Sequence, residues 1–410
     1  MRILFFAHFA GSPYHGMVFG HYNLAREWVK MGHEVTIVAA SYAHTRFTQP
    51  EQSKKLREEI MDGIRYVWVP TPTYQPANWF GRIRSILSFT WKTRFLPLPV
   101  KKADLVICSS HYTTPIYAAK RYAKRFNAKL VFEVRDLWPL TLTELGGAST
   151  KNPFIMWLQR AENFAYKHAD KVVSVLSGAK DHMLAHGMKP EKFVFIPNGV
   201  SFENALEQSE LPIDHLKKLQ AFRQNNKLVI GYAGRIGLAN ALHVLIEALA
   251  LTKDPEIGVA ILGSGSHLDE LKALAQKLKI EKNVLFLDPV NKNQVPAFLE
   301  KLDAAYIGLQ KQSLFRFGVS PTKLNDFMLA GKPIIYAIEV PGNTVEESGA
   351  GISCPAENPQ ALCQAILTMK NMSKEDRDAM GKRGREWVIK NRDYKKLAAD
   401  FLEAVFENSP

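Results

Sequence analysis

The sequence predicts an α/β protein made of two Rossmann-like, doubly wound domains with a cleft between them. Its 410 residues exceed what one hydrophobic core supports, and short apolar runs alternate along the chain with longer stretches of helical period. This alternation begins again after a polar segment near residue 200. We therefore expect one domain over residues 1–200, a second over 201–385, and a helix over 386–410 that packs back toward the first domain.

Apolar runs of four to six residues predict the strands of the first domain. They lie at 3–7, 35–39, 65–69, 105–108, 130–134, 172–175 and 193–196. Helices fit between most of these runs. In the helix expected over 23–31, Leu24, Trp28 and Met31 share one face, and Gly32 follows as a helix stop.

The second domain repeats this pattern after a linker at residues 200–212. Strands are expected at 228–233, 258–262, 284–287, 304–308 and 333–337, and helices at 241–251, 268–278, 323–329 and over 373–408. Ligands of doubly wound sheets bind beyond the carboxyl ends of the strands, so the residues that follow each strand are the candidates for a site.

The composition excludes several classes of protein. With 46% hydrophobic and 23% charged residues the chain is globular, and no run of eighteen apolar residues could span a bilayer. Its three cysteines have no metal-ligand spacing, which suits a reducing cytoplasm. The net charge of +13 concerns partners, and nucleic acid is not expected because no nucleic-acid-binding motif is present.

Residues 78–102 form a basic segment rich in aromatic side chains. No acidic residue lies between Asp62 and Asp104. One interpretation is that this segment lies on an anionic membrane, with its rings at the apolar boundary. The other is an amphipathic helix whose apolar stripe faces the core while its basic residues are solvated.

Two glycine turns of the second domain follow predicted strands. Gly234-Arg235-Ile236-Gly237 follows the strand at 228–233, where glycine lets a phosphate approach the backbone and Arg235 can pair with its oxygens. Gly263-Ser264-Gly265 follows the strand at 258–262 and can pack against a base or ribose. The alternative for the second turn is a helix N-cap at Ser266.

A third motif places a lysine at a helix start. Ser320 is expected as the N-cap and Pro321 as the first helical residue, so that Lys323 lies in the first turn. A lysine there opposes the helix dipole unless an anion lies nearby. We therefore expect an anion site at Lys323, with Ser320 beside it among the donor-binding residues, and a lysine that reaches solvent as the alternative.

These motifs, with Ala330-Gly331-Lys332-Pro333 and Gly349-Ala350-Gly351, resemble the GT-B glycosyltransferases of family 4, which are retaining enzymes. The resemblance covers nearly the whole chain. The run from Val134 to Pro139 is similar to a subgroup that acts on aminosugar donors in O-antigen and capsule assembly.

The resemblance implies roles for residues of the donor domain. Arg235 matches an arginine on the donor diphosphate, and Lys323 supplies the charge of a usual lysine that Asn240 replaces. Asp326 matches the second acid of a paired-acid motif, near the ribose. Gly318 stands where the first acid, which contacts the transferred sugar, is expected.

In the first domain the resemblance implies an acceptor side. The loop through Gly16 belongs to it, and Arg135 stands where many members have a histidine. Asp136, which follows the strand at 130–134, is expected near the reacting sugar, with a helix cap as the alternative. His111 is a further candidate for the acceptor side, with a structural histidine as the alternative.

The implied reaction is the retaining transfer of an N-acetylated hexosamine or related sugar. The donor is expected to be linked to UDP, and the acceptor to be a membrane-associated glycan or a polyprenyl-diphosphate-linked glycan at the inner face of the cytoplasmic membrane. No metal and no other cofactor are expected, because Asp376 and Asp378 belong to a helix start capped by Ser373. A sugar-nucleotide epimerase and a non-catalytic donor-binding subunit are the alternatives.

Overall fold

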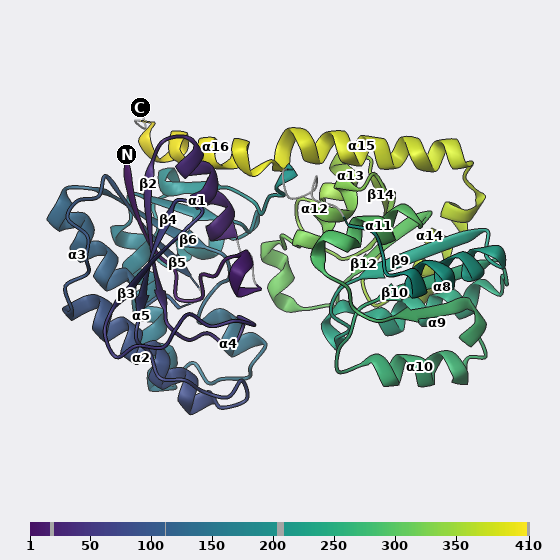
Figure 1. Cartoon of the computed structure of the whole chain (residues 1–410), viewed down its shortest axis with the longest axis horizontal. Helices are drawn as coiled ribbons and strands as arrows, with labels where there is room; N and C mark the ends of the chain where they lie inside the picture. Colours follow the sequence, from purple (N-terminus) through teal and green to yellow (C-terminus); the bar gives the residue numbers. More distant parts are fainter. Residues whose placement is uncertain (17–19, 111, 203–208, 408–410) are drawn as a thin grey trace. The chain divides into compact units, whose positions relative to one another are not determined.

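The computed structural model describes residues 1–16, 20–110, 112–202 and 209–407. The chain forms two compact units, each drawn in Figure 1. Unit 1 comprises Met1–Asn198, Phe317–Ser320 and Tyr394–Pro410, and unit 2 comprises Gly199–Arg316 and Pro321–Asp393.

Unit 1 contains an eight-stranded sheet in the order β3-β4-β2-β1-β5-β6-β7-β8. All neighbouring strands are parallel except β3, which pairs antiparallel with β4 at the edge. The strands are β1 (Arg2–Phe6), β2 (Glu34–Ala40), β3 (Arg57–Met61), β4 (Ile64–Val69), β5 (Leu105–Ser110), β6 (Lys129–Val134), β7 (Lys171–Ser174) and β8 (Phe193–Phe195). The order reverses between β1 and β5, which defines the switch point of a doubly wound sheet.

Helices cover both faces of this sheet because successive residues of a strand point to opposite faces. Phe5 contacts Trp28 of α1 (Gly20–Lys30), whereas Phe6 contacts Tyr122 of α3 (Ile116–Phe126). The other helices of unit 1 are α2 (Trp79–Phe95), α4 (Leu140–Glu144), α5 (Pro153–His168), α6 (Lys180–Ala185) and α16 (Tyr394–Phe406), with the 3-10 turns η1 (Pro13–His15) and η2 (Pro190–Lys192).

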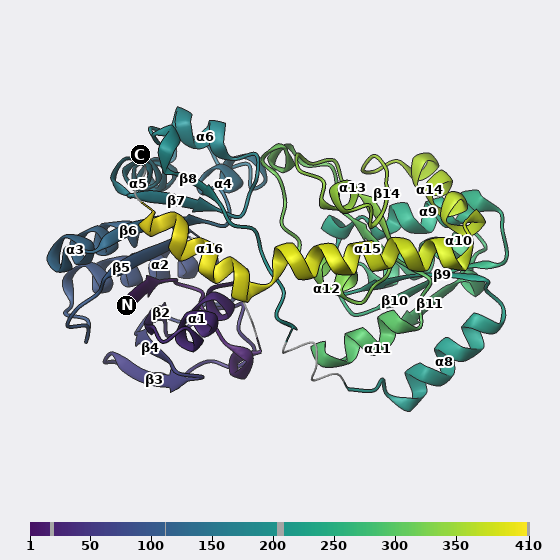
Figure 2. The ribbon, with the colours of Figure 1, turned by 90° about the horizontal axis from the view of Figure 1, so that it is seen from above.

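Helix α16 completes the core of unit 1. It lies beside α1 in both ribbon views (Figures 1 and 2), where the Trp28 indole nitrogen donates a 2.9 Å hydrogen bond to the Ala398 carbonyl and the ring packs against Phe401. The single helix predicted over 386–410 is wrong. The preceding helix α15 (Lys374–Arg392) ends because Asp393 is extended and the Val200 amide donates to the Arg392 carbonyl.

Unit 2 contains a six-stranded parallel sheet in the order β11-β10-β9-β12-β13-β14. The order reverses between β9 and β12, so the switch point lies where these two strands end. The strands are β9 (Leu228–Ala233), β10 (Ile257–Leu262), β11 (Val284–Leu287), β12 (Ala304–Gly308), β13 (Ile334–Ala337) and β14 (Gly351–Ser353). The remaining helices are α8 (Ile213–Gln224), α9 (Leu242–Thr252), α10 (Leu268–Lys277), α11 (Val295–Glu300), α12 (Thr322–Leu329), α13 (Thr344–Ser348) and α14 (Pro359–Asn371), with 3-10 turns at Leu238–Asn240, Glu281–Asn283, Lys292–Gln294 and Ser313–Phe317.

The predicted fold class, two doubly wound α/β domains, is confirmed. All twelve predicted strands are present within two residues of the expected bounds, while β3 and β14 were missed. Strand β3 reads Arg-Glu-Glu-Ile-Met on an exposed edge, and β14 has only three residues, so neither gives the apolar run of a buried strand. None of the described helices is long and apolar enough to cross a membrane.

Candidate functional site

Lys323 lies at the switch point of unit 2, in the first turn of α12, the helix that follows β12. Its ammonium donates a 2.6 Å hydrogen bond to the Tyr232 hydroxyl and lies 3.2 Å from the Asn240 side-chain oxygen. It also sits 4.5 Å from the centre of the Tyr232 ring. Tyr232 is in β9, so the lysine bridges the two strands at which the sheet order reverses.

The turn after β9 closes this arrangement. The Tyr232 hydroxyl donates to the Arg235 carbonyl at 2.7 Å, and the Asn240 amide nitrogen donates to the same carbonyl at 3.1 Å. Gly234 has a φ of +142°, and a Cβ there would lie 2.6 Å from Lys323 Cε. A glycine is therefore required for the turn to accept the lysine.

Within the described ranges, the charge of the Lys323 ammonium is not paired with a carboxylate. No carboxylate oxygen lies within 4.0 Å of it in the part of the chain that the structure describes, and burial lowers the pKa of Lys323 to about 8. A buried cation without an acid partner is costly, and an anion beside it would remove that cost. Because the switch point is also where such sheets bind ligands, this geometry favours a negatively charged group of a ligand.

We predict that the affinity for the expected diphosphate ligand falls as pH rises above 8. Lys323 loses its proton with a pKa of about 8 in the free protein, and a bound diphosphate raises that pKa, so the association constant should decrease by up to about tenfold per pH unit above 8. Calorimetric titrations from pH 7 to pH 9.5 measure this slope. The Lys323→Met variant should bind more weakly and lose the slope, and an identical slope in the variant would show that another group is responsible.

The same ionisation affects stability with the opposite sign. Because the folded-state pKa of Lys323 lies below the ordinary lysine value, the unfolded chain binds more protons between about pH 8 and pH 10.5. The unfolding free energy contributed by this group should therefore rise with pH across that window.

The structure places the other predicted donor residues around this point. Arg235 is exposed and directly follows Gly234. Asp326 lies one turn after Lys323 in α12, where its carboxylate is 3.9 Å from the Lys292 ammonium and burial raises its pKa. Lys323 and the Gly234–Arg235 turn are thus brought together, whereas Asp326 pairs with Lys292.

The turn at Gly263-Ser264-Gly265 packs directly on the Gly234–Arg235 turn. A Cβ at Gly263 would lie 1.9 Å from the Gly234 carbonyl oxygen, and one at Gly265 would lie 1.9 Å from that of Ile236. The Ile236 amide donates to the Ser264 carbonyl at 2.8 Å. These glycines support the lysine turn through close backbone contact, and the Ser266 N-cap is wrong because His267 occupies that position.

Ser320 is not the N-cap of α12. The helix begins at Thr322 with Pro321 as its N-cap, while the Ser320 hydroxyl accepts a 3.0 Å hydrogen bond from the Asn198 amide. The Asn198 side chain donates to the Ser320 carbonyl at 2.8 Å. This pairing competes with capping and fixes the residues that lead into α12 to unit 1.

Arg135 is buried in unit 1 and is already paired. Its guanidinium lies 3.2 Å from the Glu133 carboxylate and donates to the Asn198 side-chain oxygen at 2.5 Å. Glu133 is also 3.2 Å from His21. The predicted place of Arg135 on the acceptor side stays a prediction, but its contacts are those of a residue that holds Asn198 and, through it, Ser320.

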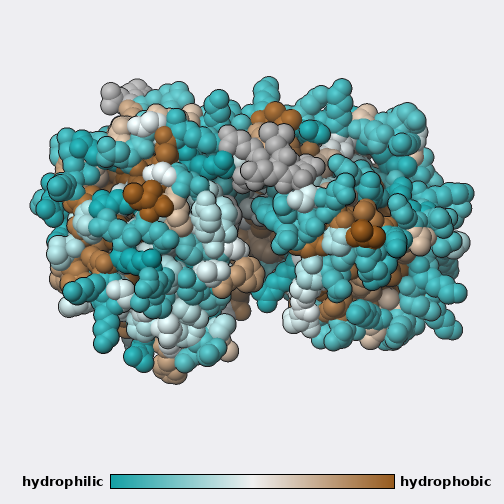
Figure 3. All heavy atoms as spheres, viewed as in Figure 1, coloured by the Kyte–Doolittle hydropathy of each residue, from teal (hydrophilic) through white to brown (hydrophobic). Residues whose placement is uncertain are grey.

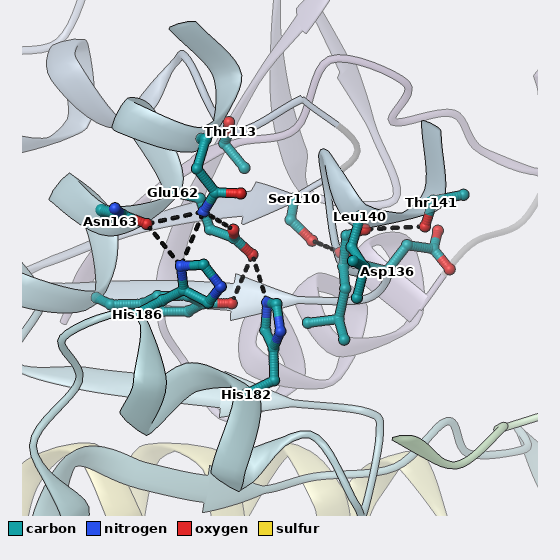
Figure 4. Close-up of polar contacts among 12 residues, drawn as sticks. Ser110, Thr113, Asp136, Leu140, Thr141, Glu162, Asn163, His182 and His186 are labelled. Atoms are coloured by element: carbon teal, nitrogen blue, oxygen red, sulfur yellow. Dashed lines mark hydrogen bonds and ion pairs between the residues drawn. The ribbon is translucent and has the colours of Figure 1, made fainter. Parts of the chain in front are cut away.

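Three further predictions concern unit 1. Asp136 is exposed, and in Figure 4 its carboxylate points away from the group formed by Glu162, His182 and His186. The helix-cap alternative is not seen, because the N-cap of α4 is Pro139. Gly16 is exposed with a φ of +68°, and His111 lies outside the described residues.

Sequence reasoning missed two buried ionic groups of unit 1. Glu133 lies in the apolar strand β6, and Glu162 accepts hydrogen bonds from Tyr166 and Gln159 beside His182, as Figure 4 shows in part. For Glu133 the available signal was a lone acid within an apolar run, because such a charge needs a buried partner. Glu162 stands among other polar residues of α5, so no such signal marked it.

Gly318 has a φ of +93°, and a Cβ there would lie 2.8 Å from the Ser177 hydroxyl. The Gly178 amide donates to the Phe317 carbonyl. A side chain at position 318 would therefore strain this contact, which explains why no acid stands there. Among the described residues, no three His, Cys, Asp or Glu side chains form a group that could hold a metal ion.

Comparisons with known proteins give matches along both halves of the chain. Residues 16–199 match the family model described as "Glycosyl transferase 4-like domain", and residues 216–387 match "Glycosyl transferases group 1". WcaI of Escherichia coli (strain K12), named as a glycosyl transferase of colanic acid biosynthesis, is 24% identical over 92% of this chain and 93% of its own. WbjE of Pseudomonas aeruginosa, named as a glycosyltransferase, is 27% identical over 60% of each chain.

Among solved structures, Anabaena Alr3699/HepE in complex with UDP and glucose has the same fold. Its TM-score is 0.65 at 17% identity, over 99% of each chain. The two α/β units and the matched models define the class, a glycosyltransferase with the GT-B fold. The chain belongs to the family-4 type of these enzymes.

Proposed function

We propose that this glycosyltransferase moves an N-acetylated hexosamine or a related sugar from a UDP-linked donor to a membrane-associated glycan or lipid-linked acceptor, in the synthesis of a bacterial surface polysaccharide. The observation that carries the proposal is the partly buried Lys323 ammonium at the switch point of unit 2, which has no carboxylate partner among the described residues. The name of WcaI supports a role in polysaccharide synthesis, and the UDP complex of Alr3699/HepE supports UDP as the nucleotide of the donor.

In the proposed reaction the bond between the anomeric carbon and the diphosphate oxygen breaks, and the acceptor hydroxyl forms a new bond to that carbon on the same face. The hydroxyl proton passes to the leaving phosphate. As the old bond breaks, the diphosphate gains negative charge, which Lys323 and Arg235 stabilise without a metal. Lys323 is suited to this role because Tyr232 and Asn240 hold it in place before the charge develops.

Release of UDP from a panel of UDP-linked hexosamines, with and without a polyprenyl-diphosphate-linked glycan, tests this function. A transferase releases UDP in proportion to the acceptor, and the product keeps the anomeric configuration of the donor. An epimerase would change the sugar without an acceptor, and a binding subunit would release nothing. Either of the last two results contradicts the proposal.

Helix α2 supports the membrane location of the acceptor. Its buried face carries Ser85, Ile86, Phe89 and Thr93. Its outer face is also apolar: Phe80, Leu87, Trp91 and Phe95 are 80%, 46%, 57% and 58% exposed, at the spacing of one helix stripe. This exposed apolar stripe supports the interpretation in which α2 lies on a membrane.

The charge around this outer stripe is positive. Arg84 lies within it, Lys101 and Lys102 are exposed just beyond the helix, and the surrounding segment has no acidic residue. Figure 3 shows pale and tan atoms along the lower margin of unit 1, where α2 lies. Exposed aromatic rings beside cations are typical of a surface that lies in the headgroup region of an anionic bilayer.

We predict that the chain binds vesicles containing phosphatidylglycerol through this outer face. Replacing Trp91 and Phe95 together with serine should weaken binding about tenfold or more, because two rings no longer enter the interface. Stability should change little, since both side chains are exposed. Co-sedimentation measures the affinity.

The matched control is Ile213→Ser, which removes a 72% exposed apolar side chain from α8 of unit 2 and should leave vesicle binding unchanged. The proposal that α2 docks on the membrane would be wrong if the double variant bound the vesicles as tightly as the unchanged chain. It would also be wrong if the unchanged chain bound vesicles of phosphatidylcholine alone as tightly as those with phosphatidylglycerol.

A further inference from the structure

We propose that a hollow on the outer edge of unit 1 binds a neutral sugar unit of the acceptor glycan. This inference rests on the transferase function proposed above and assigns it an acceptor subsite. The hollow has a volume of about 480 Å³ and lies between η1, the connection from β2 to β3, and β3 itself. Sites for small molecules commonly have volumes of about 300 to 1,000 Å³.

One wall of the hollow, formed by η1, lies toward the end of the sheet at which ligands bind, whereas Ile60 and Met61 of β3 stand beside the amino end of β4. The 3-10 turn η1 follows the carboxyl end of β1, and its buried residue His15 packs edge-to-face against Trp68 near the carboxyl end of β4. His15 is held by a 2.8 Å hydrogen bond with Ser12. The wall formed by η1 is thus fixed to the core of unit 1, and the opposite wall is the paired edge strand β3.

An exposed but oriented aromatic ring stands at the hollow. Tyr14 is 63% exposed, yet its hydroxyl donates to one oxygen of Asp62 at 3.2 Å, and the other oxygen accepts from Tyr22 at 2.5 Å. Asp62 thereby fixes the direction of a ring that would otherwise be free to rotate. The electron-rich face of such a ring attracts the partly positive C–H groups of a sugar. Ile60, 74% exposed on β3, adds apolar surface nearby.

The charge of the lining selects the class of ligand. Three carboxylates line the hollow, from Glu51, Glu59 and Asp62, against one guanidinium, from Arg57. Burial and the nearby Arg46 lower the pKa of His15, so its ring adds no positive charge at neutral pH. The hollow is therefore acidic in a chain whose net charge is +13.

Carboxylates accept hydrogen bonds from sugar hydroxyls and repel phosphates and uronic acids. The Trp68 indole donates to Glu59 at 2.9 Å and orients this acid to accept further hydrogen bonds, while Glu51 lies at the surface, 3.0 Å from Arg57. A neutral, hydroxyl-rich sugar fits this combination of an oriented ring and fixed acceptors, and an anionic sugar does not.

Saturation-transfer NMR on the full chain tests the subsite with methyl glycosides of glucose, galactose, mannose and N-acetylglucosamine, with sodium glucuronate as the anionic comparison. At least one neutral glycoside should receive saturation, and glucuronate should not. Tyr14→Ala should weaken binding about tenfold through loss of the ring. Phe195→Ala, which removes a 39% exposed ring from β8 at the opposite edge of the sheet, should bind as the unchanged chain does.

Binding of UDP to unit 2 is measured on the same samples and separates the two proposals. If UDP binds and no neutral glycoside does, or if Tyr14→Ala binds them as the unchanged chain does, the subsite is wrong while the transferase stands. If glucuronate binds as well as the neutral glycosides, the assigned class is wrong. If UDP itself fails to bind, the proposed function is wrong.

Discussion

Replacing Lys323 with methionine is expected to reduce turnover at least about a hundredfold while the protein remains folded. One preorganised donor to a developing oxyanion typically contributes about 3 kcal/mol to transition-state stabilisation. Methionine keeps most of the volume and loses the charge, so the effect isolates the ammonium. Since burial already disfavours the charged lysine, the variant should be at least as stable as the unchanged chain at neutral pH.

Steady-state UDP release measures this effect, and thermal unfolding checks the fold. Lys311→Met is the matched control, because this lysine is also in unit 2 and its side chain is 69% exposed. The turnover of this variant should equal that of the unchanged chain. Arg235→Ala should reduce turnover to a similar degree if both cations contact the diphosphate. Wild-type rates in Lys323→Met would remove the assignment of the donor site, whatever the rate of Arg235→Ala.

The sequence was sufficient for the parts of the fold that depend on regular apolar patterns. Central strands such as β1 and β9 are buried on both faces and read as continuous apolar runs, so their positions followed directly. Strand β3 could not be found this way, because only one of its five residues is buried and its pairing depends on the neighbouring β4. Local pattern does not contain that tertiary contact.

Part of the candidate site was predicted from the sequence, and for a physical reason. Lys323 stood out because a lysine in a first helical turn opposes the dipole, and the structure shows it partly buried with no acid beside it in the described ranges. Tyr232 and Asn240 were not predicted as its partners. A tyrosine in an apolar strand looks like core, and its hydroxyl becomes significant only once β9 and β12 are neighbours.

Ser320 shows the opposite error. Its sequence context is that of a helix cap, and the local rule is sound for an isolated segment. In the folded chain the hydroxyl instead accepts from the Asn198 amide, and the Asn198 side chain is held in turn by Arg135. Contacts between residues more than a hundred positions apart override the local preference, and no single-sequence pattern announces them.

The second large effect is expected at Arg135. Replacing it with methionine should lower the unfolding free energy of unit 1 by about 3 to 5 kcal/mol, because it leaves the Glu133 carboxylate buried without its cation. Although burial opposes it, His21 and Arg135 together lower the pKa of Glu133 to about 2, so this carboxylate is charged in the folded protein at neutral pH.

Urea unfolding followed by tryptophan fluorescence measures the loss, since six of the seven tryptophans lie in unit 1. The double variant Glu133→Gln/Arg135→Met removes both charges and should recover a large part of the stability. If Arg135 stabilised unit 1 only through packing, the second substitution would recover nothing. If Arg135→Met alone unfolds like the unchanged chain, the pair of Arg135 and Glu133 does not stabilise unit 1 through its charges.

Arg135 also donates a hydrogen bond to Asn198, which in turn donates to Ser320, so Arg135→Met should in addition loosen Ser320, the residue that leads into the helix of Lys323. The turnover of Arg135→Met should therefore fall by a larger factor than its affinity for UDP.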